Sequence, residues 1–130
     1  VVLKTFVAHG RNSGKKYAEK FSNNISSYQS SLGFYITGNA YKGKHGNSLV
    51  LDGVEKGIND HAMQRAIVIH GADYVNPILL QQQGYIGRSQ GCPAVPNNQI
   101  NSIISTIQGA SCLFIYAPDH QYLQSSKLIH

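Results

Sequence analysis

Charged side chains are scarce in this sequence, and tryptophan is absent. Asp, Glu, Lys and Arg make up 13% of the 130 residues, about half of the roughly 25% usual in soluble domains. Ser, Asn and Gln take their place and together account for about a quarter of the chain. No apolar run approaches the roughly 18 residues of a membrane-spanning helix, so no membrane span is predicted. The hydrophobic share of 42% argues against a disordered chain.

Cysteine is also rare, with Cys92 and Cys112 as its only copies. Two cysteines are too few for a disulfide-built scaffold. Cys112 lies in an apolar segment, and we expect it to be a buried structural thiol. The net charge of +5 comes from 11 basic and 6 acidic residues. Because the basic residues are scattered, nucleic acid is not predicted as a partner, and a weakly basic surface suits an acidic polymer equally well.

The chain shows no linker and no internal repeat, so we expect one domain over residues 1–130. The region 11–32 has few periodic apolar positions and is expected to be a long loop with at most a turn of helix. Short apolar segments bounded by Gly, Asn and Ser predict strands. These segments are residues 1–8, 33–37, 48–52, 66–70 and 112–117.

Residues 97–108 have the periodicity of an amphipathic helix. Pro96 suits its first position and Gly109 the residue after its end, and a shorter helix is expected over 77–83. The apolar positions of the longer helix are Ile100, Ile103, Ile104 and Ile107. These patterns predict a mostly β fold with one good amphipathic helix and short helical turns. Antiparallel or mixed pairing is expected, because the strands are too close in sequence for parallel crossovers.

The densest chemical signal surrounds Cys92, which lies between Gly91 and Pro93. Glycine allows close backbone approach, so that amide N–H groups can point at a developing oxyanion, and proline fixes the turn. This setting favours a nucleophilic cysteine. The alternative is a buried structural thiol, which is the common fate of a cysteine.

A nucleophilic thiol needs a base, because little of it is thiolate at neutral pH. His70 is the best candidate among six histidines, since it ends the apolar segment AIVIH and is followed by Gly71. Strand ends deliver side chains rigidly to a surface cleft. Cys92 follows across an irregular connection that could fold back. The alternative is a packed histidine that only ends a strand.

Competing patterns occupy the same region. Residues 87–91 match the G-x-S-x-G elbow of α/β-hydrolases but lack the buried strand before it and the helix directly after it. The Gln-Gly-Cys sequence is similar to that of caspase-like proteases, whose His lies about 50 residues upstream. No histidine or cysteine pair has the spacing of a zinc site. No metal and no other cofactor is therefore predicted.

His70-Gly71 followed by Ser89-Gln90-Gly91-Cys92 resembles the active-site signature of L,D-transpeptidases, which is a His, a gap and then [S/T]-H-G-C. The resemblance is to the murein L,D-transpeptidase catalytic domain branch, whose motif reads S-x-G-C-P. It extends over nearly the whole chain. The matching segments are VAHGRNSG (7–14), FSN (21–23), SSLGFYITG (30–38), YKGKHG (41–46), LDG (51–53), RAIVIHGADYV (65–75) and GRSQGCPAVP (87–96).

The sequence departs from the wider family at Gln90, where a His is usual, at Pro93-Ala94, where Arg or Asn is usual, and in a longer gap between His and Cys. The resemblance implies a β-sandwich-like catalytic domain that acts on peptidoglycan stem peptides without a cofactor. It also implies an exported protein of the periplasm or cell envelope, whose signal sequence is missing from this fragment. A monomer is expected.

The resemblance implies that Cys92 attacks the third residue of a tetrapeptide stem and releases D-Ala. An acceptor amine would turn the thioester into a 3→3 cross-link, and water would give carboxypeptidase action instead. His70 would carry the proton, and the backbone N–H of Cys92, with Gly91, would hold the oxyanion. Ser89 would order the turn or orient His70. The third catalytic group in this family is often a main-chain carbonyl.

Further residues are assigned to substrate binding. Arg88, beside the nucleophile, could pair with a stem carboxylate. Tyr41 and His45 could line the cleft, and Gly71 follows the base. His9 and Arg11 are weaker candidates for the same cleft-lining role. Solvated loop positions are the alternative for these side chains. A non-catalytic wall-binding domain and a metal-dependent hydrolase are the alternative functions.

Overall fold

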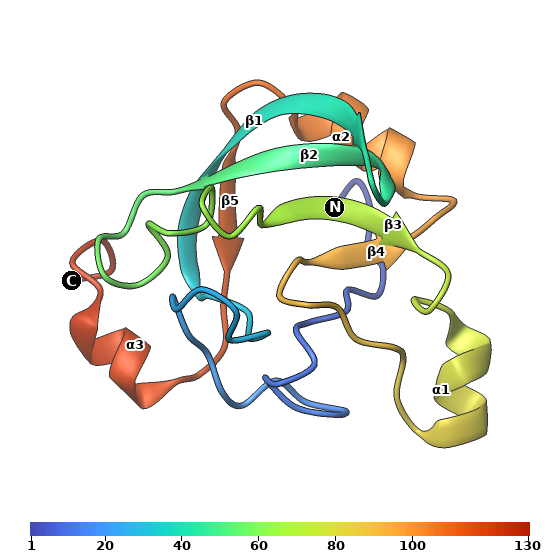
Figure 1. The fold of residues 1–130 in the computed structure, drawn as a ribbon, viewed down its shortest axis with the longest axis horizontal. Coiled ribbons are helices and arrows are strands. Elements are labelled where there is room, and N and C mark those ends of the chain that lie inside the picture. Colours follow the sequence, from blue (N-terminus) through green and yellow to red (C-terminus); the bar gives the residue numbers. More distant parts are fainter.

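A computed structural model describes residues 1–130, and it is built mainly of strands with a few short helices (Figure 1). This confirms the mostly β prediction and its single amphipathic helix. No helix exceeds eight residues, and none has the length and apolar character needed to cross a membrane. The elements are β1 (Gly33–Gly43), β2 (Gly46–Gly53), β3 (Val68–Ala72), α1 (Pro77–Gln83), β4 (Ala94–Pro96), α2 (Ile100–Ile107), β5 (Cys112–Ile115) and α3 (His120–Ser125).

The five strands form one mixed sheet in the order β4-β3-β2-β1-β5. All neighbours are antiparallel except β3 and β4, which run parallel, so the expected mixed pairing is confirmed. The crossover between β3 and β4 contains α1 (Figure 1). One row of paired residues runs across four strands, and it consists of Tyr41, Ser48, His70 and Ala94.

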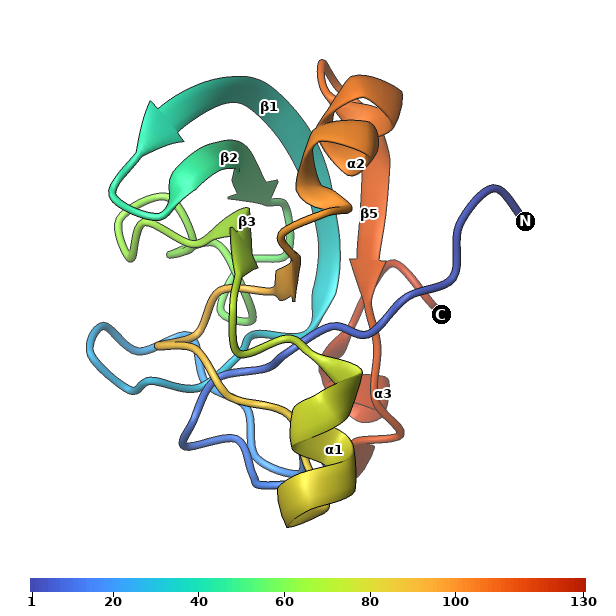
Figure 2. The same cartoon turned by 90° about the vertical axis from the view of Figure 1, so that its right-hand side faces the viewer.

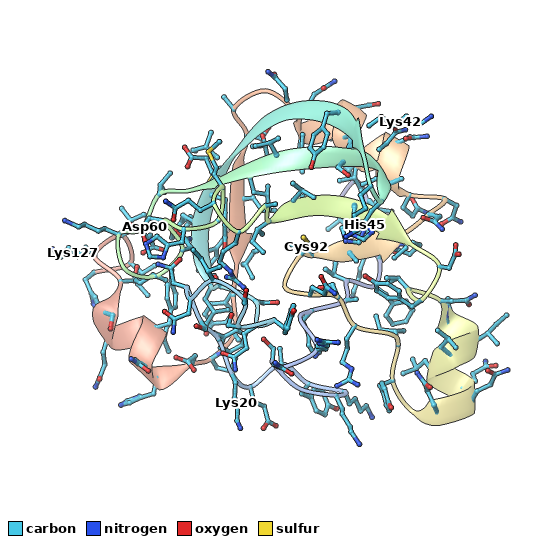
Figure 3. The ribbon with its side chains drawn as sticks, viewed as in Figure 1. Lys20, Lys42, His45, Asp60, Cys92 and Lys127 are labelled. Atoms are coloured by element: carbon cyan, nitrogen blue, oxygen red, sulfur yellow. The ribbon has the colours of Figure 1, made fainter.

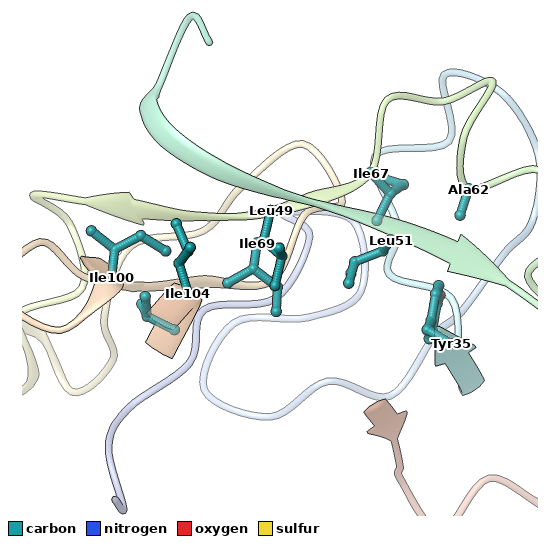
Figure 4. Close-up of a cluster of buried hydrophobic side chains, with 9 residues drawn as sticks. Tyr35, Leu49, Leu51, Ala62, Ile67, Ile69, Ile100 and Ile104 are labelled. Carbon is teal, nitrogen blue, oxygen red and sulfur yellow. The ribbon is translucent and has the colours of Figure 1, made fainter. Parts of the chain in front are cut away.

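The apolar core lies between one face of the sheet and α2 (Figures 2 and 4). Because side chains alternate along a strand, Leu49 and Ile69 point to the face opposite to Ser48 and His70. Burying each such large apolar side chain stabilises the fold by about 1.5–3 kcal/mol. The buried cluster comprises Tyr35, Leu49, Leu51, Ala62, Ile67, Ile69, Val95, Ile100 and Ile104.

The loop over residues 11–32 contains no helix or strand, as expected. Figures 1 and 2 show it below the β3–β4 edge of the sheet. The chain just before it is joined to the segment before β4, since the Arg11 N–H donates to the Ser89 carbonyl at 2.8 Å and the Ser89 N–H donates to the His9 carbonyl at 2.9 Å. The loop therefore forms part of the surroundings of the Cys92 turn.

The predicted strand over residues 1–8 is wrong. Only Ala8 forms a bridge, to Ala94, through two backbone hydrogen bonds of 2.7 and 3.1 Å. β4 is three residues long and so offers too little edge for a longer partner. The N-terminal residues remain extended and exposed.

Two elements also differ from their expected boundaries. The third strand runs over Val68–Ala72, so His70 lies in its middle and not at its end. The long helix begins at Ile100 because Pro96 still pairs with Ala72 in β4; Gln99 occupies the N-cap position without a side-chain hydrogen bond. The helix ends at Ile107, one residue earlier than expected, with Gln108 as its C-cap, and Gly109 follows with a φ of 78°.

Cys112 is exposed, which contradicts the predicted buried thiol. β5 is an edge strand in which Leu113 and Ile115 pack against the core, so the alternate residues Cys112 and Phe114 face outwards. A continuous apolar run concealed this alternation in the sequence.

The final helix, α3, was not predicted because it has no long apolar pattern. Asp119 caps its N-terminus by accepting from the Tyr122 N–H at 2.9 Å. The Tyr122 hydroxyl donates at 2.8 Å to buried Glu55, which also accepts from the Phe34 N–H and the Ser126 hydroxyl. This polar contact attaches the helix to β1 and to the segment after β2.

Candidate active site

Cys92 lies in an irregular turn just before β4, as its neighbours predicted. The buried Ser89 hydroxyl closes this turn, because it accepts from the Gly91 N–H at 3.1 Å and donates to the Cys92 carbonyl at 2.5 Å. Gly91 has a φ of 126°, and a Cβ there would lie 3.1 Å from both Arg65 Nη2 and the Gln29 carbonyl oxygen. Only glycine suits this position.

The Cys92 thiol is half-buried and bonds to backbone groups. Its sulfur accepts from the Val68 N–H at 3.5 Å and donates to the Ala66 carbonyl at 3.6 Å. Ala66 has a φ of 55°, an uncommon conformation for a non-glycine residue. Burial raises the pKa of the thiol, while the Val68 N–H and the Arg65 charge act against that rise. At neutral pH the resting sulfur is therefore protonated.

His70 is buried, with 2% of its surface exposed. Its Nδ1 lies 2.9 Å from the Gly71 carbonyl oxygen. Since a carbonyl only accepts, Nδ1 carries the proton and Nε2 is left with its lone pair. Burial lowers the pKa of His70, the Gly71 contact opposes this, and the charge of nearby His45 lowers it further. The imidazole is thus neutral at neutral pH.

The β3–β4 register brings the Cys92 turn next to β3, the strand that carries His70. His70 pairs with Ala94, two residues after Cys92, and the sulfur bonds to Val68, two residues before His70. The Cys92 side chain also packs against the core cluster that contains Ile67 and Ile69. In this resting arrangement the thiol is bonded to Ala66 and not to the imidazole.

The β1–β2 hairpin brings His45 to His70 (Figure 3). The two rings are stacked, with centroids 4.3 Å apart and an interplanar angle of 17°. Tyr41 occupies the outer end of the row that contains His70 and is exposed. Its ring lies against Gly43, where a Cβ would be 2.7 Å from the ring. His45 therefore belongs to the site, whereas Tyr41 lies at its margin.

Gly71 contributes its carbonyl to the site. A Cβ on Gly71 would lie 2.6 Å from Asn97 Oδ1, so the position lacks room for a side chain. The main-chain oxygen of Gly71 orients the His70 ring, and it is a candidate for the main-chain carbonyl that the resemblance implies as third group.

Arg88 is bonded to the chain itself. Its Nη1 donates to the Arg11 and Gly14 carbonyls at 3.2 and 3.3 Å, and its guanidinium lies 5.4 Å from the Tyr85 ring centre. His9 Nε2 bonds to the same Gly14 carbonyl at 2.9 Å. His9, Arg11 and Arg88 thus fix the start of the 11–32 loop beside the Cys92 turn.

Sequence reasoning missed Arg65 and Tyr74. Arg65 acts on the Cys92 sulfur through its charge, and the charge on that sulfur raises the pKa of Tyr74, whose burial raises it more. One feature of the sequence could have drawn attention to Arg65. Arg65 is the only Asp, Glu, Lys or Arg between Asp60 and Asp73, directly before an apolar segment.

A family model described as L,D-transpeptidase catalytic domain matches residues 1–116. The chain belongs to this family. The assignment agrees with the mostly β fold and its five-stranded mixed sheet. No curated protein and no solved structure gave a significant match. Membership in the L,D-transpeptidase catalytic domain family implies a peptidoglycan-related function, and such domains generally act outside the cytoplasm.

A cavity of about 930 Å³ lies elsewhere in this L,D-transpeptidase domain. Its lining is mainly apolar and comes largely from the N-terminal segment, α2 and β5, and it includes neither Cys92 nor His70. The candidate site is the Cys92 turn, which lies beside the strand that carries His70 and its carbonyl partner Gly71. No three His, Cys, Asp or Glu side chains gather as a metal site would require.

Proposed function

We propose that the protein is a cysteine-dependent peptidoglycan L,D-transpeptidase that acts on tetrapeptide stems and forms 3→3 cross-links. The observation that supports the proposal is the position of Cys92 in a fixed turn beside β3, the strand that carries His70, whose Nδ1–H is held by the Gly71 carbonyl. That contact leaves His70 Nε2 as the acceptor for the thiol proton. Export to the periplasm or cell envelope, and a monomeric state, are part of the same proposal.

The first half-reaction builds a thioester. His70 Nε2 takes the proton of the Cys92 thiol, which must first leave the Ala66 carbonyl. The sulfur forms a bond to the carbonyl carbon at the L-centre of the third stem residue. The C–N bond to D-Ala then breaks, and the His70 imidazolium returns the proton to the leaving amine.

The second half-reaction regenerates the thiol. The amine of a neighbouring stem attacks the thioester carbon and passes its proton to His70, and the C–S bond breaks. The thiolate then takes the proton back. With water in place of the amine, the same steps give L,D-carboxypeptidase action.

The Cys92 N–H supplies the oxyanion site in this proposal. It donates to no protein acceptor, whereas the Gly91 N–H is already bonded to the Ser89 hydroxyl. Gly91 and Ser89 therefore act as positioning residues that aim the Cys92 N–H at the substrate oxygen. This differs from the expectation that Gly91 shares the oxyanion.

Substrate contacts are assigned to residues around the turn. Arg88 uses only Nη1 in its contacts with Arg11 and Gly14, so its other donors are left for a stem carboxylate. His45 covers the His70 ring and is exposed, so it would meet the substrate at the cleft wall. Tyr41 would line the outer end of that wall.

Intact-mass analysis tests the nucleophile and the reaction class together. After mixing with a tetrapeptide donor or a carbapenem, the protein is expected to gain one covalent adduct and to release D-Ala from the donor. Cys92→Ala should lose both. Cys112→Ala is the matched control, because the second thiol is exposed and remote from His70 in the sheet, and it should retain both.

An adduct on Cys112, or D-Ala release by Cys92→Ala, would overturn the proposal. Adding an acceptor stem separates the two fates of the thioester. A cross-linked product indicates transpeptidation, and a tripeptide alone indicates carboxypeptidase action.

A further inference from the structure

Arg65 is held by four hydrogen bonds from one guanidinium. Nη1 donates to the Ser22 carbonyl at 3.0 Å and to the Ser31 hydroxyl at 2.7 Å. Nη2 donates to the Ser27 hydroxyl at 3.1 Å and to the Gln29 carbonyl at 2.6 Å. All four acceptors come from the loop that lies below the β3–β4 edge. The side chain therefore has one fixed position.

None of these acceptors carries a charge. No carboxylate affects the pKa of Arg65. The only charges that act on that pKa are those of ionised Tyr35 and ionised Cys92. The guanidinium is half-buried and stays protonated at any physiological pH. A half-buried cation normally has an anionic partner, because hydrogen bonds to neutral groups do not neutralise it. Here the positive charge is uncompensated in the resting protein.

This charge lies beside the Cys92 turn. A Cβ on Gly91, the residue before the nucleophile, would be 3.1 Å from Arg65 Nη2. The residue after Arg65, Ala66, provides the carbonyl that accepts from the thiol. Both approaches place the guanidinium beside the Cys92 turn, and its charge acts to lower the pKa of the thiol.

We propose that Arg65 is a positioning residue of the active site, which fixes the loop against the Cys92 turn and whose uncompensated charge stabilises the Cys92 sulfur as a thiolate. The inference rests on the proposed function only in taking Cys92 as the nucleophile. It explains why a cation without a carboxylate partner is kept at this place: its counterion is the thiolate that forms when His70 accepts the proton.

Other groups also face the sulfur. The Val68 N–H donates to it and favours the thiolate, as Arg65 does. Tyr74 is neutral, because burial raises its pKa, and a neutral His70 adds no charge. Arg65 is therefore the one fixed positive charge acting on the thiolate, and its removal should be visible in the ionisation of the thiol.

The test measures the rate of iodoacetamide alkylation of Cys92 as a function of pH, in a Cys112→Ala background that removes the second thiol. Arg65→Gln keeps amide donors but removes the charge. We expect the thiol pKa to rise by about one unit, so that alkylation at neutral pH slows about tenfold. Lys127→Gln is the control for net charge, because Lys127 is exposed and lies far from Cys92 (Figure 3); it should not move the profile.

Arg65→Lys keeps the charge and loses the planar fork that holds four acceptors. Its thiol pKa should stay within about half a unit of the parent, while donor turnover falls. A shift as large as one unit in Arg65→Lys overturns the inference, even if Arg65→Gln does not fold. An Arg65→Gln profile identical to that of Lys127→Gln overturns it as well.

The D-Ala release assay and the thiol pKa distinguish a failure of the proposed function from a failure of the inference about Arg65. If the parent releases no D-Ala but the thiol pKa depends on Arg65, the proposed function is wrong and the inference about Arg65 holds. If the parent is active and the thiol pKa is indifferent to Arg65, only the inference about Arg65 is wrong.

Discussion

Ser89→Ala removes the hydroxyl that closes the Cys92 turn. The change leaves the Gly91 N–H and the Cys92 carbonyl without their partner in a buried position. An unsatisfied buried polar group costs about 1–3 kcal/mol, and Cys92 is only half-buried, so water can relieve part of the loss. We expect the free energy of unfolding to fall by about 2 kcal/mol. For a chain of this length the melting temperature should fall by about 7 °C.

The effect on catalysis should exceed the effect on folding. The hydroxyl fixes the direction of the Cys92 N–H and of the sulfur, and a displacement of about 1 Å at a reacting group costs on the order of 100-fold in rate. We expect kcat for D-Ala release to fall between 10- and 100-fold, with most of the protein still folded at the assay temperature. Circular dichroism melting and donor turnover measure the two effects on the same sample.

Ser105→Ala is the matched control. The Ser105 hydroxyl also donates to a backbone carbonyl, that of Asn101, but on the exposed side of α2. Its removal should change stability by less than about 0.5 kcal/mol and leave turnover unchanged. The reasoning is refuted if Ser89→Ala keeps parental kcat, or if its loss of activity equals the unfolded fraction.

The remaining predictions concern pH, folding and inhibition. Burial and His45 lower the pKa of His70, so kcat/KM should fall as the pH is lowered, with a midpoint below pH 6.5. His45→Ala should move that midpoint to higher pH. A midpoint above pH 7 in the parent, or an unchanged midpoint in His45→Ala, contradicts this prediction. Tyr122→Phe removes one donor from the buried Glu55 carboxylate and should cost about 1–3 kcal/mol in urea unfolding, with unchanged kcat; parental stability contradicts the proposed attachment of α3. Iodoacetamide should abolish activity and chelators should leave it intact; the reverse result would indicate a metal-dependent hydrolase.

Local sequence patterns predicted the structure correctly where a single residue type determines the backbone conformation or the buried face. The turn around Cys92 was predictable because Gly91 permits a backbone that other residues avoid and Pro93 limits the next residue. The amphipathic helix was predictable from its isoleucine spacing. The assignment of His70 as the base stays a prediction, and its expected place at a strand end was wrong, since it lies within β3.

The contacts that depend on register and on distant loops were not predictable. The stacking of His45 on His70 requires the hairpin and β3 to align, and nothing local specifies that alignment. Arg65 appeared to be an ordinary charge because its four acceptors lie 34 to 43 residues earlier in the chain. Cys112 was misjudged because an apolar run does not reveal which of its residues faces outwards.

Because β3 and β4 pair in parallel, the position of the Cys92 turn relative to β3 does not depend on the length of the chain that connects the two strands. Parallel strands enter a sheet from the same end, so the residue preceding β4 arrives next to the start of β3 however long the intervening chain is. That chain contains α1, which buries none of its residues. Insertions or deletions there would leave the Cys92 turn in register with the strand that carries His70. The longer spacing between His70 and Cys92 in this chain thus lies where the domain surface can vary without moving that turn.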